Sequence, residues 1–166
     1  MGIKKAAAVR GLIPAGSKVS ELRSNLNRLM TEMPVVFEEK LGRQGLEAVS
    51  ELFRRLGEQD AKNMKARLGL QDTLKDSLDA WKVVGHIMGA KMVPRWVSKY
   101  RVETDHPYCP QYEAFVAQGK LYCDVVCLPY VRAVAEGVAP SVKMEVVRPA
   151  NDEATCVKAL VTLPQK

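Results

Sequence analysis

The sequence predicts an α+β domain in which a helical N-terminal half packs on a small antiparallel sheet. Apolar residues recur every three or four positions up to about residue 90, which is the period of an amphipathic helix. Beyond that point the period changes to two in three separate segments, as expected for half-buried strands. A pair of short helical segments that carries most of the cysteines lies between the first two of these strands. Helices segregated from strands in this way are typical of the α+β class.

Three apolar stripes predict the helices of the first half. The first follows a candidate N-cap, Ser17, and covers residues 19–33, where Pro34 predicts the end of this helix or the start of the next. The second covers residues 37–56, with an interruption near the glycines of "LGRQG", and the third covers residues 74–88. We interpret all three stripes as core faces, because amphipathic helices usually bury their apolar side.

The second half is predicted to alternate strands with two short helices. The strands are expected near residues 93–103, 140–148 and 156–163, with the last two joined as a hairpin through "PANDEAT". Pro110 is well placed in the first turn of a helix that reaches about residue 117. A second helix is expected over about residues 121–135.

Length and composition predict a flexible tail at residues 1–16 and one domain at residues 17–166. A chain of 166 residues is long enough to bury its own core without covalent staples. The net charge is +6, but the basic residues are spread along the chain, so a nucleic-acid role is unlikely on sequence grounds. No apolar run approaches the ~20 residues that span a bilayer. We therefore expect a cytoplasmic protein with no membrane partner.

The segment "HPYCPQYEAFVAQGKLYCDVVC" holds three of the four cysteines and one of the two histidines. In the cytoplasm, cysteines are expected as thiols or metal ligands rather than disulfides. Cys123 and Cys127 are four apart, so on a continuous helix they would share one face and could hold zinc, with Cys109 and Cys156 completing the set. The alternative is that these are inert buried thiols, since the predicted helix is apolar nearly all round.

A nucleophile is the other interpretation of this segment. Cys109 precedes Pro110 at a predicted helix N-terminus, where the helix dipole favours the thiolate form. His106 lies three residues earlier and could act as its general base. The alternative is that "HPYCP" simply forms a tight turn.

Four segments together carry a family resemblance: "FEEKLGRQGLEAVSELFRRLGEQDAKNM", "RVETDHPYCPQYEAF", "LYCDVV" and "NDEATC". Over about residues 35–163 the chain resembles the L-2-amino-thiazoline-4-carboxylic acid hydrolase family. The anchors are the Cys109-Pro110 pair, Cys123 and Cys156. The resemblance implies hydrolysis of a cyclic C–N or C–S centre in a small carboxylic acid, by an activated cysteine or a metal-bound water. An arginine would bind the ligand carboxylate; Arg101 and Arg132 are candidates, with solvated roles as the alternative.

The chain is also distantly similar to 4-vinyl-reductase-like small-molecule-binding domains, some of which bind zinc. That similarity would make Cys123, Glu145 and Cys156 metal ligands, although a further expected cysteine is absent near Arg148. The function predicted first is thus a hydrolase-like protein with a cysteine-lined pocket for a small carboxylic acid. The alternative is a non-catalytic binding or sensory domain, with zinc as the candidate cofactor. A homo-oligomer also stays open.

Overall fold

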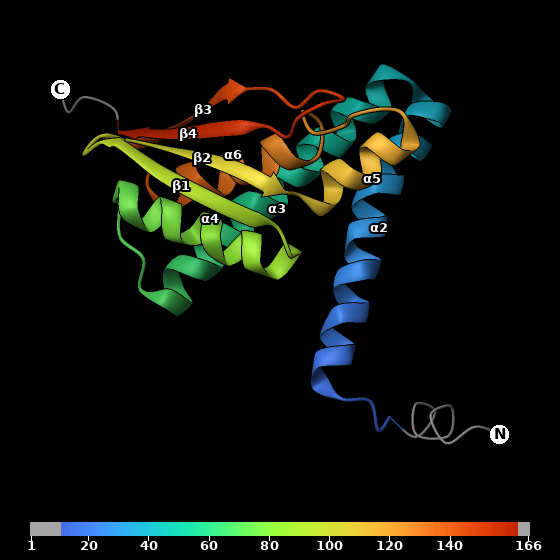
Figure 1. The fold of residues 1–166 in the computed structure, drawn as a ribbon, viewed down its shortest axis with the longest axis horizontal. Helices are drawn as coiled ribbons and strands as arrows, with labels where there is room; N and C mark the ends of the chain where they lie inside the picture. The colour runs from blue at the N-terminus through green and yellow to red at the C-terminus, as the bar shows by residue number, and fades with distance from the viewer. Residues whose placement is uncertain (1–10, 163–166) are drawn as a thin grey trace.

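The computed structural model describes residues 11–162, in which α4 and α6 cover one face of a four-stranded sheet and α3 packs on α6 (Figure 1). The predicted α+β class is confirmed. The elements follow the chain in the order α2 (Ala15–Leu41), α3 (Arg43–Leu68), α4 (Leu74–Met88), β1 (Lys91–Ser98), β2 (Arg101–Tyr108), α5 (Pro110–Gln118), α6 (Cys127–Val138), β3 (Val142–Arg148) and β4 (Val157–Thr162). Residues 1–10 of the predicted tail lie outside the described residues, whereas Ala15 and Gly16 already belong to α2.

The sheet has the strand order β1-β2-β4-β3, with every neighbouring pair antiparallel. The predicted β3–β4 hairpin is confirmed, although position 163 of the last predicted strand lies outside the described residues. The single strand expected near residues 93–103 is wrong, because the chain turns at Lys99 and Tyr100 and forms the hairpin β1–β2. The apolar alternation runs on through this turn, so the period alone gave no sign of it.

The helix α2 continues through Pro34, so the expectation that this proline ends or begins a helix is also wrong. Pro34 is buried, and the helix tolerates its missing N–H because packing on neighbouring elements holds the turn in place. The break falls instead at Gly42, whose φ of 58° lies in the left-handed region that favours glycine.

A third correction concerns the start of α6. The helix expected from about residue 121 begins only at Cys127, and residues 123–126 form a turn. The amides of Val125 and Val126 both donate to the carbonyl of Tyr122, at 3.1 and 2.9 Å. Cys123 therefore precedes the helix, and the premise that it shares one helical face with Cys127 does not hold.

The α3–α6 crossing brings two helix backbones close together. A methyl group placed at Gly57 of α3 would collide with the Tyr130 carbonyl of α6 and lie 2.9 Å from the Ala133 side chain. One placed at Gly137 of α6 would lie 2.8 Å from the Ala61 side chain of α3. These contacts fix α3 against α6, and thereby the position of α6 under the sheet.

We predict that Gly57→Ala destabilises the protein by about 1–3 kcal/mol, the usual cost of overpacking, because the new methyl group meets backbone rather than a mobile side chain. The matched control is Gly16→Ala in α2, where nothing lies within 4 Å of the added methyl group. That variant should match the wild type or gain up to about 1 kcal/mol. Urea unfolding midpoints measure both. Equal stability of Gly57→Ala and the wild type would show that the helices are not in close contact at this point.

Candidate functional site

An apolar cavity of about 50 Å³ lies under the sheet, between α4, α6 and the start of α5. Apolar walls with a few convergent polar groups are the usual composition of small-molecule sites. The apolar lining includes Met30, Trp81, Val84, Met88, Met92 and Val131, and the polar lining consists of His106, Cys109, Gln111, Cys127 and Lys158.

Lys158 is the main charged group of this cavity. It is only 2% exposed, and its ammonium donates to Cys156 Sγ at 3.3 Å and lies 5.9 Å from the centre of the Trp81 ring. Burial is the largest single influence on the pKa of Lys158 and lowers it, whereas the hydrogen bond to Cys156 raises it. Within residues 11–162, no carboxylate forms an ion pair with it. A buried cation of this kind attracts a small anion.

His106 and Thr104 lie on the same face of the sheet as Lys158. Thr104 is opposite Lys158 in the β2–β4 register, and His106 is two residues further along β2. Among the described residues, the buried Nδ1 of His106 and Oγ1 of Thr104 have no hydrogen-bond partner. Burial, with a smaller effect from Lys158, lowers the pKa of His106 to about 3, so its imidazole is neutral at pH 7. Unpaired buried polar atoms are rare in proteins, and their presence beside a cavity indicates room for a bound molecule or water.

Cys109 lines the cavity as the residue that precedes α5. Burial raises the pKa of its thiol, although the backbone amide of Tyr112 lowers it and the nearby Lys158 lowers it further. The Sγ donates to Gln111 Oε1 at 3.4 Å. The amides at the start of α5 lower the pKa of Cys109, as the sequence predicted for a helix N-terminus, but burial raises it and is the larger effect.

The four cysteines are all free and each is partly buried. Burial is the main cause of a raised pKa at Cys123. Burial also raises the pKa of Cys127 to about 12. No three histidine, cysteine or acidic side chains in residues 11–162 are placed to hold a metal ion. The predicted zinc site therefore has no ligand cluster in this part of the chain.

Glu145 and Arg101 lie on the other face of the sheet. Glu145 and Glu103 are both opposite Ala159, the neighbour of Lys158, so alternation directs them away from the cavity. Arg101 binds Glu145 at 2.7 Å and Glu103 at 3.1 Å. The structure therefore does not bring the predicted ligand-binding Arg101, or the predicted metal ligand Glu145, to the cysteines.

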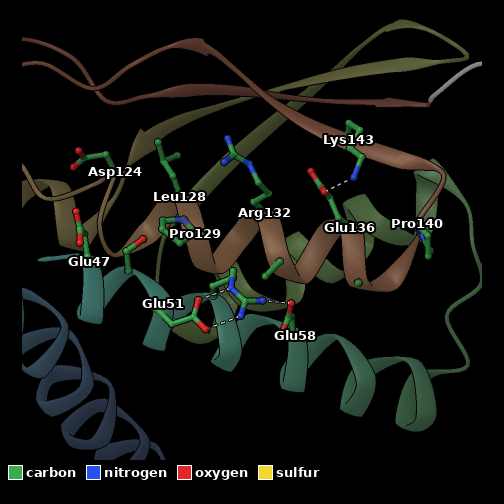
Figure 2. A pocket seen from close by; sticks show the side chains of 14 residues that line it. Glu47, Glu51, Glu58, Asp124, Leu128, Pro129, Arg132, Glu136, Pro140 and Lys143 are labelled. Atoms are coloured by element: carbon green, nitrogen blue, oxygen red, sulfur yellow. Dashed lines mark hydrogen bonds and ion pairs between the residues drawn. The ribbon is translucent and has the colours of Figure 1, made fainter. Parts of the chain in front are cut away.

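Arg132, the other predicted carboxylate-binding residue, lines a charged groove of about 860 Å³ between α3 and α6 (Figure 2). The groove is the larger of the two hollows, but its other charges largely satisfy one another. Arg54 pairs with Glu51 and Glu58, and Lys143 pairs with Glu136 at 2.7 Å. We favour the cavity as the candidate site because, among the described residues, Lys158 has no carboxylate partner and the Nδ1 of His106 has no hydrogen-bond partner.

Sequence reasoning found Cys109 and His106 but missed Lys158. A lysine in a strand is usually solvated, so the charge of Lys158 favoured the face of the sheet that points to solvent. The sequence did contain a signal for burial: Lys158 is two residues from Cys156 and from the buried Leu160, so all three lie on the same face of the strand.

No family model matches this sequence, and a comparison with curated proteins found no match either. Solved structures of the same fold do exist. One is a trafficking protein particle complex subunit 3 from Naegleria fowleri, covalently bound to palmitic acid, with a TM-score of 0.61 and 13% identity over 88% of this chain and 97% of that one. Another is the phenol-responsive sensory domain of the transcription activator PoxR with phenol, with a TM-score of 0.58 and 12% identity over 85% of this chain and 74% of that one. At these identities the likeness shows the fold alone. Separately, no helix within residues 11–162 combines the length and apolar character needed to span a membrane.

We predict that His106 makes the folded state sensitive to acid. Its pKa is about 6.5 when unfolded and about 3 when folded, so the stability contributed by the neutral imidazole is complete above pH 6.5 and is lost as the pH falls toward 3. The free energy of unfolding changes through this one group by at most about 1.4 kcal/mol per pH unit. Between pH 7 and pH 4, the free energy of unfolding measured with urea should therefore depend less steeply on pH in His106→Asn than in the wild type. Equal slopes would mean that His106 has the same pKa in the folded and the unfolded protein.

We also predict slow alkylation of the cavity thiols. Because burial raises the pKa of Cys109 and Cys127, both half-buried thiols are mostly protonated at pH 8. Iodoacetamide labelling followed by mass spectrometry should be at least tenfold slower in the folded protein than in the same protein unfolded in urea. Labelling of Cys109 at the unfolded rate would indicate an activated thiol.

Proposed function

We propose that this chain is a non-catalytic domain that binds a small molecule in the cavity under its sheet. The observation that carries the proposal is the buried ammonium of Lys158, which faces an apolar cavity together with the unpartnered Nδ1 of His106. A partner anion would satisfy both groups at once. The comparisons support the binding role, since one protein of the same fold holds phenol and another holds palmitic acid.

The ligand that suits this site is small, mainly apolar, and carries one weakly acidic oxygen. The oxygen would accept hydrogen bonds from the Lys158 ammonium and from His106. Trp81 and three methionines, Met30, Met88 and Met92, provide the apolar contact. The cavity of about 50 Å³ exceeds the ~30 Å³ share of one water but is smaller than an aromatic ring with its substituent. Binding would therefore displace methionine side chains, which adapt readily because they are unbranched and flexible.

Hydrolysis has less support than binding. A general base works best with a pKa near the working pH, whereas the pKa of His106 is lowered to about 3. The thiol of Cys109 is shifted toward its protonated form, which is the poorer nucleophile. The resemblance to the thiazoline-carboxylic acid hydrolases, with Cys109 as nucleophile, stays a prediction.

Calorimetry with benzoate, phenol and benzyl alcohol tests the proposal. We expect benzoate to bind and to raise the melting temperature, because a ligand of the folded state alone stabilises it. Lys158→Met should weaken benzoate binding at least tenfold and leave the uncharged benzyl alcohol less affected. The matched control is Lys143→Met in the α3–α6 groove, which should bind benzoate like the wild type.

Two results would contradict this function. The first is that none of the three probes binds or stabilises the protein. The second is that the protein hydrolyses a cyclic thiazoline carboxylic acid and that Cys109→Ser does not, which would favour the hydrolase function. If Lys158→Met binds benzoate as tightly as the wild type, the protein binds a small molecule but Lys158 does not bind its carboxylate.

A further inference from the structure

The N-terminal half of α2 presents an apolar stripe that no other part of residues 11–162 covers, so the prediction that this first stripe is a core face is wrong. Val19, Leu22, Leu26 and Leu29 are 53%, 68%, 41% and 55% exposed. Figure 1 shows this half of the helix, in blue, extending away from the sheet and the helices beneath it. Four large apolar side chains in one row on a projecting helix form a surface that usually has a partner.

The flank of the same helix that lies next to the stripe is fixed to its own domain. Arg23 donates from Nε to the Ile87 carbonyl at 2.7 Å and from its guanidinium to the His86 carbonyl at 3.1 Å, at the C-terminal end of α4. Gln111 donates to Asn27 at 2.8 Å, and Met30 is buried. The stripe is therefore held in a defined position with its apolar side facing outward.

We infer that this stripe pairs with the same stripe of a second copy of the chain, with the two helices antiparallel. The spacing of residues 19, 22, 26 and 29 alternates three and four, which is the seam of a coiled coil. A two-fold antiparallel pair makes the stripe self-complementary, as an isologous interface requires. In that register Val19 lies opposite Leu29 of the second copy, and Leu22 lies opposite Leu26 of the second copy.

Charge complementarity supports the antiparallel pair. The antiparallel register brings Lys18 beside Glu32 of the second copy, and symmetry repeats this pair at the other end of the seam. Asn25 then meets its own copy beside the two-fold axis. Arg23 approaches its own copy on the other side of the seam, but its guanidinium is already bonded to the His86 and Ile87 carbonyls of its own chain. Within residues 11–162, Lys18 has no ion-pair partner, and Glu32 only accepts a hydrogen bond from Gln118.

The size of the seam indicates a reversible dimer. Residues 18–33 of one helix span about 24 Å at 1.5 Å per residue, a short contact compared with obligate interfaces. This inference concerns α2 and does not depend on the ligand proposed for the cavity.

Sedimentation velocity over a wide range of protein concentration tests the pairing. The wild type should approach twice its 18.4 kDa mass as concentration rises. Leu26→Glu should weaken association at least tenfold while the circular dichroism spectrum and melting temperature stay those of the wild type. The matched control is Leu56→Glu on α3, a leucine of similar exposure (45%) outside the stripe, which should dimerise normally.

Charge exchange tests the antiparallel register. Lys18→Glu and Glu32→Lys should each weaken the dimer several-fold, and the double variant should recover the wild-type dimerisation constant. Three outcomes would overturn the inference: a monomer at every concentration, a dimer that Leu26→Glu leaves unchanged, or a double variant weaker than either single one.

Discussion

The buried ammonium of Lys158 is the constraint on which the chemistry of this molecule depends. Taking a cation out of water is costly, and the sheet surrounds this one with Trp81, Cys156 and the walls of an apolar cavity. Its charge contributes to the low pKa of His106 and opposes the rise in the pKa of the Cys109 thiol. The cavity is therefore an electropositive hollow in apolar surroundings, which is the reason to regard it as an anion site.

The thiols around Lys158 show how burial competes with charge. A nearby cation favours the thiolate, whereas desolvation favours the neutral thiol, and both act on each sulfur here. Burial is the larger effect at Cys109, Cys123 and Cys127, whose pKa values all rise. Cys109 and Cys127 consequently contribute predominantly protonated thiols to the lining of the cavity.

Much of the fold could be predicted from the sequence, because periods of 3.6 and 2 report which faces are buried. The wrong predictions have local causes. The alternation of apolar residues continues through the turn at Tyr100, so one strand was predicted where there are two. The turn after Tyr122 resembles the start of a helix, because two backbone amides donate to one carbonyl. The site was only partly predictable. Cys109 and His106 lie close in sequence and bracket the cavity, but the burial of Lys158 depends on α4 and α6 covering that face of the sheet, a long-range contact that no local pattern encodes.

The helix α2 connects the two proposals physically. One side of it carries the exposed stripe, and the other contributes Met30 to the cavity wall and Asn27 to the hydrogen bond that holds the cavity residue Gln111. A ligand large enough to displace Met30 would press on the helix that carries the dimer seam. By linkage, any factor by which the ligand changes dimerisation is also the factor by which dimerisation changes ligand affinity. If both proposals hold, the shared helix is thus the element through which an occupied cavity would alter assembly.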